Sequence, residues 1–167
     1  MEKALTFNQL APYLPFGIRG VSKDENLGIE LVKGYSTYGM NNNINLTTNI
    51  DDIDIECFMP ILRPLSDLTN EIEHNGEKFI PIYRLAELFL YNDIHNHSLR
   101  KFEVRDNYIL VTFGSQDGVN STITSVQIKT ALFRMEYWQL EKLFEWNFDV
   151  FGLIPENLAI DINTLKP

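Results

Sequence analysis

The first part of the chain alternates apolar and polar positions in short runs. Four such runs, punctuated by glycine and asparagine, cover residues 27–32, 35–40, 44–48 and 53–57. A period of two places one face of a strand in a core and the other face in water. Turns of ordinary length connect the runs, so residues 18–62 are predicted to form an antiparallel meander.

Two short helices are predicted by their flanking residues. Thr6 and Gln9 form the capping-box pair at the start of a helix that should end near residues 13–14, because a proline follows. A second helix is expected over residues 67–72, with the Asn75-Gly76 pair closing it in a left-handed conformation.

Two further segments carry an apolar stripe with the period of an α-helix. Pro81 suits the first position of one helix, whose stripe runs through residues 82–89. The other helix is the longest, over residues 135–150, and Gly152 is expected to end it. Its stripe is largely aromatic and consists of Tyr137, Leu140, Phe144, Phe148 and Phe151.

The remaining strands are predicted between these two helices. Residues 102–105 and 108–113 form a hairpin in this interpretation, and residues 122–128 form a further strand. The 108–113 run is apolar on both faces, which places it centrally in its sheet. The fold class is therefore α+β in a single domain, residues 1–167. An antiparallel sheet carries the long aromatic C-terminal helix and two or three short helices packed on it.

Composition and charge narrow the possible functions. Among 167 residues, 14 basic residues face 23 acidic ones, which gives a formal net charge of −9. Binding to a phosphate backbone depends on lysine and arginine, so non-specific nucleic-acid binding is disfavoured. No apolar run approaches the length of a membrane span, and the N-terminus lacks a signal-peptide pattern. We therefore expect a cytoplasmic protein that has no membrane partner.

Residues suited to catalysis or metal binding are sparse. Cys57, the single cysteine, alternates with isoleucines and acids, which favours a structural thiol over a nucleophile. His95 and His97 are spaced like a metal-binding pair, but their polar segment is typical of a loop. The acids of residues 51–56 lack the spacing of a calcium loop. We expect no catalytic residue, metal or cofactor, and hence a protein that is not an enzyme.

The candidate binding residues are Tyr35, Tyr38, Asn42 and Arg63. Tyrosine offers a large contact area at low entropic cost and asparagine offers adaptable hydrogen bonding, so the loop expected over residues 34–43 is typical of a binding loop. Arg63 lies in an extended segment between two prolines and would supply charge to an anionic ligand if it lies nearby.

Four segments together resemble short uncharacterised proteins of gut-bacterial prophages and mobile elements. They are residues 10–17 (LAPYLPFG), 60–69 (PILRPLSDLT), 143–154 (LFEWNFDVFGLI) and 158–165 (LAIDINTL). The family form has histidine at the position of Asn147. The matched segments contain caps, prolines and the aromatic helix, which build a scaffold, whereas the unmatched segments are strands and loops. This division suits a binding protein better than an enzyme.

The leading functional hypothesis is a small phage-type binding protein that captures its target through loops on the α+β scaffold. The target is either a small ligand, such as a nucleotide immune signal that it sequesters, or a host protein whose surface it covers. Either activity would counteract host defence. A hydrolase with dispersed carboxylates and an oligomeric structural or assembly protein are the alternatives.

Overall fold

The computed structural model describes residues 3–23, 28–38, 43–85, 97–105, 108–115, 120–126 and 137–165, with side chains described outside residues 97–126. The chain forms two compact units, Met1–Pro64 with Glu141–Pro167, and Leu65–Leu140. Both helices and mostly antiparallel sheets are present, which confirms the α+β class. The expectation of a single domain over residues 1–167 stays a prediction.

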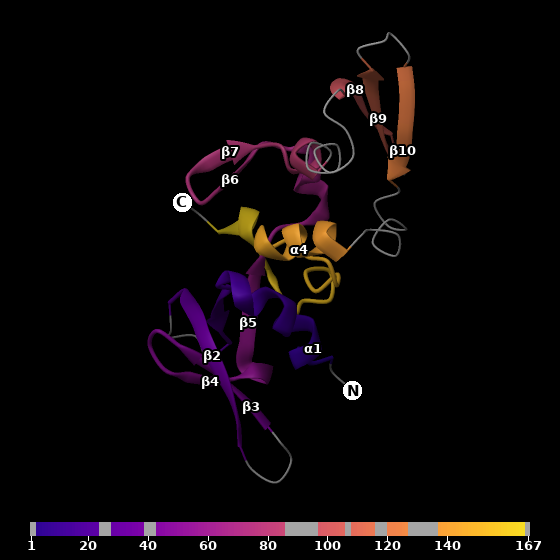
Figure 1. Cartoon of the computed structure of the whole chain (residues 1–167). Helices are drawn as coiled ribbons and strands as arrows, with labels where there is room; N and C mark the ends of the chain where they lie inside the picture. Colours follow the sequence, from indigo (N-terminus) through magenta and orange to yellow (C-terminus); the bar gives the residue numbers. More distant parts are fainter. Residues whose placement is uncertain are drawn as a thin grey trace. The chain divides into compact units, whose positions relative to one another are not determined.

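The first unit is built on a sheet whose six described strands follow the order β11-β5-β1-β2-β3-β4. Figure 1 labels four of them, β2 to β5. The strands are β1 (Arg19–Ser22), β2 (Glu30–Tyr38), β3 (Asn43–Thr48), β4 (Asp52–Asp54), β5 (Phe58–Leu62) and β11 (Ile160–Asp161). Neighbours are antiparallel except β11 and β5, which are parallel. The antiparallel strands expected over residues 18–62 are present, but two of the expected runs, residues 27–32 and 35–40, are replaced by the single strand β2, and β5 pairs with β1 rather than with β4.

The sheet curls, because its connectivity does not allow a flat one. In the strand order, β4 and β5 are four spacings apart, which in a flat sheet would be about 19 Å. Only η2 (Ile55–Cys57) connects them, and even a fully extended chain from Asp54 to Phe58 reaches no further than roughly 14 Å. The edge that carries β4 therefore curves back toward β5, and the side chains on the inner face are enclosed.

The strand expected over residues 53–57 is shorter than predicted. It ends at Asp54, whose Oδ1 accepts a hydrogen bond from the N–H of Glu56 at 2.9 Å and begins η2. Such a carboxylate competes with the strand ladder for the backbone, and a period-two pattern does not reveal this competition. Cys57 is consequently half-buried at the end of a turn.

An N-terminal helical segment packs on this sheet. It comprises α1 (Phe7–Leu10) and η1 (Ala11–Phe16). The N–H of Thr6 donates to Oε1 of Gln9 at 3.0 Å, as the capping-box prediction requires. The segment ends at Gly17, which has a φ of 76°, and so extends slightly beyond the predicted residues 13–14.

Tyr13 ties this segment to the C-terminal part of the unit. Its side chain is fully buried, and its hydroxyl donates to the carbonyl of Phe148 at 2.7 Å. The same hydroxyl accepts a hydrogen bond from the N–H of Val150 at 3.2 Å. The Tyr13 ring meets the Phe144 ring edge-on, with centroids 5.0 Å apart. Residues from the two ends of the chain thus share one core.

The long C-terminal helix is not confirmed, because α4 covers only Tyr137–Glu145. Asn147 adopts the left-handed conformation with a φ of 58°. Its N–H donates to the Phe144 carbonyl at 3.0 Å, and the N–H of Phe148 donates to the Leu143 carbonyl at 2.9 Å. This pair of bonds is the Schellman motif, with asparagine in the place usually taken by glycine. The aromatic stripe therefore continues into turns rather than along a helix.

A second turn of the same kind follows, and Asp149 supports it. Asn157 has a φ of 58°, and the N–H of Leu158 donates to the Leu153 carbonyl at 2.9 Å. The two carboxylate oxygens of Asp149 accept the N–H groups of Leu153 and Ile154 at 2.7 and 2.9 Å. The chain then forms β11 and η4 (Ile162–Thr164).

The second unit begins with η3 (Leu65–Thr69), where a longer helix was expected. Asn75 and Gly76, with φ of 53° and 80°, form the turn of a hairpin rather than a helix cap. The hairpin strands are β6 (Ile72–His74) and β7 (Glu77–Phe79). An Asn-Gly pair satisfies the positive φ angles of a type I′ hairpin turn, and cross-strand pairing decided between the two structures.

The rest of the second unit follows the predictions more closely. Residues 81–85 are helical with Pro81 at the first position, since the N–H of Arg84 donates to the Ile80 carbonyl at 3.2 Å. The three-stranded sheet has the order β10-β9-β8, so the apolar strand is central, as expected. Its strands are β8 (His97–Arg105), β9 (Tyr108–Ser115) and β10 (Asn120–Val126).

Candidate functional site

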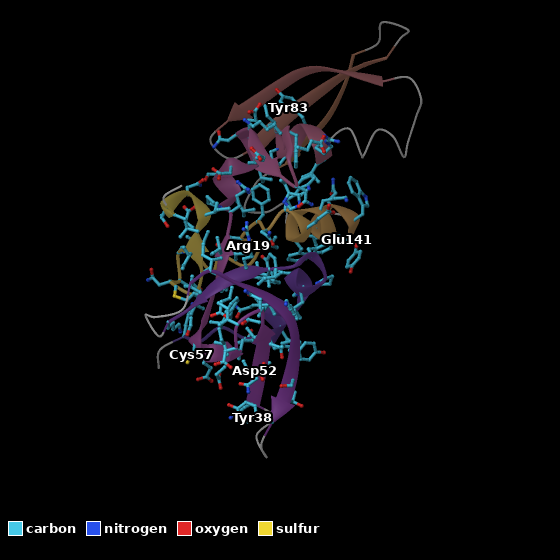
Figure 2. All side chains as sticks on the ribbon, turned by 90° about the vertical axis from the view of Figure 1, so that its left-hand side faces the viewer. Arg19, Tyr38, Asp52, Cys57, Tyr83 and Glu141 are labelled. Carbon is cyan, nitrogen blue, oxygen red and sulfur yellow. The ribbon has the colours of Figure 1, made fainter. Side chains whose placement is uncertain are left out.

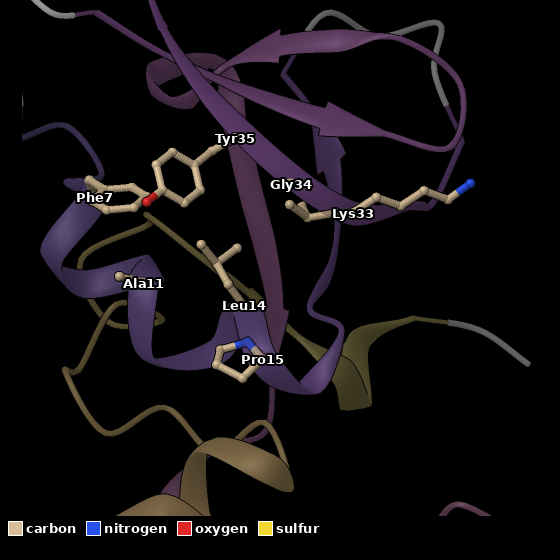
Figure 3. A pocket seen from close by; sticks show the side chains of 8 residues that line it. Phe7, Ala11, Leu14, Pro15, Lys33, Gly34 and Tyr35 are labelled. Carbon is tan, nitrogen blue, oxygen red and sulfur yellow. The ribbon is translucent and has the colours of Figure 1, made fainter.

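A pocket of about 430 Å³ lies between the N-terminal helical segment and β2 (Figure 3). We call it the helix–strand pocket. The helical segment contributes one set of lining residues and β2 contributes the other, and the lining is mainly apolar. The lining residues are Phe7, Ala11, Leu14, Pro15, Val32, Lys33, Gly34 and Tyr35.

Two aromatic rings form one wall of the pocket. The rings of Phe7 and Tyr35 are 4.5 Å apart between centroids and inclined by 52° (Figure 3). Tyr35 keeps 54% of its surface exposed, which is unusual for an aromatic residue that packs on a core helix. Its ring therefore borders both the pocket and the solvent.

A β-bulge in β2 determines the face of the sheet to which the Tyr35 side chain points. The register between β2 and β3 shifts between Val32 and Gly34, the signature of a β-bulge. Beyond the bulge Tyr35 lies opposite Leu46, which is fully buried, so Tyr35 occupies the inner face of the sheet. The bulge thus turns the tyrosine toward the helical segment and the pocket.

Of the described residues, Lys33 is the one charged residue that lines the pocket. Its side chain is exposed and extends away from the Phe7 and Tyr35 rings (Figure 3). The pocket consequently combines an apolar interior with a phenol hydroxyl at one side, and Lys33 borders it with its ammonium group directed away from the rings. This arrangement suits a ligand that has an apolar group and a polar or anionic end.

Tyr38 does not share this site. Residues 35 and 38 are three positions apart on one strand beyond the bulge, so their side chains point to opposite faces. The Tyr38 hydroxyl donates to Oδ2 of Asp54 at 2.9 Å, at the far end of the β2–β3 hairpin (Figure 2). That hydrogen bond raises the pKa of Tyr38. The binding loop was expected over residues 34–43, but residues 34–38 are part of strand β2, and residues 39–42 lie outside the described residues.

The described residues include one of the other two predicted binding residues, Arg63, which does not line the pocket. Asn42 lies outside the described residues. Arg63 follows β5, which β1 separates from β2 in the sheet. Its N–H donates to the Asn147 carbonyl at 2.7 Å, and its carbonyl accepts the N–H of Asp149 at 2.8 Å. The backbone of Arg63 therefore has a structural role in holding the C-terminal turns.

The buried carboxyl groups are engaged by the fold. Glu30 is fully buried, and the Thr48 hydroxyl donates to its Oε2. The same hydroxyl accepts the N–H groups of Ile50 and Asp51, both at 3.1 Å, and so orders the turn between β3 and β4. Asp149 uses both oxygens on backbone amides, as described above. Local hydrogen bonds therefore account for Asp149, whereas Oε1 of Glu30 is buried without a hydrogen-bond partner among the described residues.

The described residues contain neither a metal-binding cluster of side chains nor a membrane-spanning helix. Within them, no group of three or more His, Cys, Asp or Glu side chains is arranged to hold a metal ion. His95 lies outside the described residues, and His97 is described only by its backbone in β8. In the same part of the chain, no helix is long and apolar enough to cross a bilayer.

The residues that sequence reasoning missed are those of the helical segment, above all Phe7, Ala11 and Leu14. The capping box predicted their helix but not its partner strand. A signal was present in Phe7, a large apolar residue at the very start of a short capped helix. The chain matches no protein-family model, no curated protein and no solved structure. The resemblance to prophage proteins stays a prediction, and the functional argument depends on the site.

Proposed function

We propose that this protein is a binding protein and that its helix–strand pocket captures an apolar or aromatic group of the bound molecule. The pocket itself is the observation that supports this proposal. Its volume of about 430 Å³ lies in the range of roughly 300–1,000 Å³ typical of ligand sites. Its lining is mainly apolar, with few polar groups, as such sites require.

The aromatic wall favours tight capture. An exposed ring costs free energy in water, and covering it with a ligand recovers roughly 25 cal/mol for each Å² of apolar surface removed from solvent. Tyr35 is held by strand pairing and by the Phe7 ring, so little side-chain entropy is lost on binding. The proposed binding surface is thus a rigid pocket between a helix and a strand, in place of the loops expected from the sequence.

The prophage resemblance suggests what the bound molecule is. In a phage-derived protein, the pocket would capture a molecule of the bacterial host, and this capture would counteract host defence. A small signal molecule would place its ring in the pocket and its anionic end near Lys33. A host protein would place one apolar side chain there.

A fluorescent probe tests pocket binding directly. Anilinonaphthalene sulfonate has aromatic rings for the apolar interior and a sulfonate for Lys33. We expect Ala11→Leu, which fills the pocket, to weaken binding at least tenfold. Ala4→Leu makes the same change at an exposed alanine outside the pocket and should leave binding unchanged.

The two tyrosines provide a second matched pair. Tyr35→Ala should weaken probe binding by a similar factor, whereas Tyr38→Ala should not, since Tyr38 lies on the opposite face of the strand. Backbone amide shifts in NMR spectra should report the probe at residues 7–15 and 32–35. If Ala11→Leu and Tyr35→Ala both bind the probe as the unmodified protein does, the proposal is wrong.

A further inference from the structure

Among the strands that the structure describes, none pairs with one edge of β2 over most of its length. On the side away from β3, β1 pairs with Glu30 and Leu31, and the N–H of Val32 donates to the Ile18 carbonyl. Past that point, none of the described strands pairs with residues 33–38 on this side. These residues are exposed, apart from the half-buried Gly34. An edge of this kind presents unpaired N–H and C=O groups at alternate positions.

The composition of this edge differs from that of the edge formed by β4. The latter is three residues long and includes Asp52 and Asp54, and short, charged strands resist pairing with another chain. The distal half of β2, by contrast, is Gly34-Tyr35-Ser36-Thr37-Tyr38, which has no charge and is rich in strand-forming residues. Its sequence permits pairing with a further strand.

The helix–strand pocket lies beside the same stretch, since Lys33, Gly34 and Tyr35 line it. A strand that pairs with β2 would therefore run past the pocket opening. Side chains of a strand alternate between its faces, so one of them would point toward the Phe7 and Tyr35 rings. Backbone pairing along an edge, combined with a pocket for one side chain, is a recurrent mode of peptide recognition.

We propose that the occupant of this site is an extended peptide segment of a partner protein. The segment adds to the free edge of β2 as a further strand and inserts an apolar side chain into the helix–strand pocket. This inference rests on the proposed function, because it names the class of molecule that fills the same pocket. The partner segment is neutral beside Lys33, which lines the pocket, and neutral or basic in its remaining residues, because the chain carries a net charge of −9.

Synthetic hexapeptides test the proposal. Each is capped at both ends and has one central leucine or phenylalanine flanked by threonine and lysine. We expect saturable binding with amide shifts at residues 33–38, and a loss of at least tenfold when glycine replaces the apolar residue. The Ala11→Leu variant should lose the same factor, whereas Ala4→Leu should bind as the unmodified protein does.

N-methylation of the peptide backbone tests strand addition itself. In an added strand, only every second amide faces β2. Two versions of the peptide, methylated on the odd or on the even amides, should therefore differ. One version should lose about tenfold or more in affinity, because several hydrogen bonds are removed, and the other should retain binding.

The outcomes separate this inference from the proposed function. Equal affinity of both methylated versions and the parent peptide would show that a side chain binds without strand pairing. Failure of every peptide, while the fluorescent probe still responds to Ala11→Leu, would overturn the peptide proposal and leave pocket binding intact. Light scattering that shows a dimer, with the edge amides of residues 33–38 protected by a second copy, would also overturn it.

Discussion

Removal of one hydroxyl group, in Tyr13→Phe, tests how the two ends of the chain are joined. The Tyr13 hydroxyl donates to the Phe148 carbonyl at 2.7 Å in a fully buried environment. After the change, the Phe148 carbonyl and the N–H of Val150 both lose the tyrosine hydroxyl as a partner. The N–H of Val150 still donates to the Phe148 carbonyl at 2.9 Å. The substituted ring retains its edge-on packing with Phe144, so little cavity forms.

The expected cost follows from this geometry. A buried polar group that loses its partner costs about 1–3 kcal/mol, and we expect a value within this range for the free energy of unfolding of the first unit. Urea denaturation measures it, and fluorescence of Trp146 reports on this unit because that side chain is buried within it. The midpoint should fall while the slope stays constant.

The control is Tyr38→Phe, which removes a hydroxyl that donates to Asp54 at an exposed position on the hairpin. Its denaturation midpoint should match that of the unmodified protein. If Tyr13→Phe also leaves the midpoint unchanged, the hydroxyl does not stabilise the junction between the N-terminal helical segment and the C-terminal turns.

Three further predictions concern stability. Burial raises the pKa of Tyr13 above its ordinary value of 10.0, so the folded state favours the protonated phenol. The unfolding free energy should therefore decline as the pH rises above about 10, and a pH series of denaturation curves should show a smaller decline in Tyr13→Phe. Gly20→Ala would force a methyl group into the Phe58 ring and should lower the free energy of unfolding by about 1–3 kcal/mol. In the control variant Gly34→Ala the methyl group meets open space, so equal thermal midpoints for the two variants would refute this prediction. Asn147→Val should lower the free energy of unfolding by about 1–2 kcal/mol, because the backbone at this position is left-handed. Asn147→Gly should leave the thermal midpoint unchanged or raise it.

Local signals predicted the elements whose bonds close within a few residues. The Thr6–Gln9 capping box and the Pro81 helix start are both found, because each depends on atoms three or four positions apart. Tyr35 was predicted as a binding residue from its type alone, and it lines the helix–strand pocket. Its position at the pocket wall, however, depends on Phe7, which lies on a different element and packs against it.

The main errors in the predicted secondary structure lie at asparagine residues. Asn75-Gly76 suits either a helix end or a hairpin turn, since both require positive φ, and pairing of Ile72 with Phe79 selects the hairpin. The aromatic stripe past Glu145 has helical spacing, yet Asn147 takes the left-handed conformation and the chain turns. In that conformation its carbonyl accepts the Arg63 N–H and Phe148 forms a bridge with Arg63. These contacts join residues more than eighty positions apart, so no local pattern contains them.

The sequence by itself determined which stretches are apolar on one face and where the helices at Thr6 and Pro81 begin. The strand order, the curl of the sheet and the β-bulge in β2 were decided by tertiary structure. These features depend on long-range pairing, whose free energy is gained only after distant segments meet. The separation of Tyr35 from Tyr38 follows from them. One tyrosine faces the N-terminal helical segment and the other faces Asp54, because a strand rather than a loop holds them both.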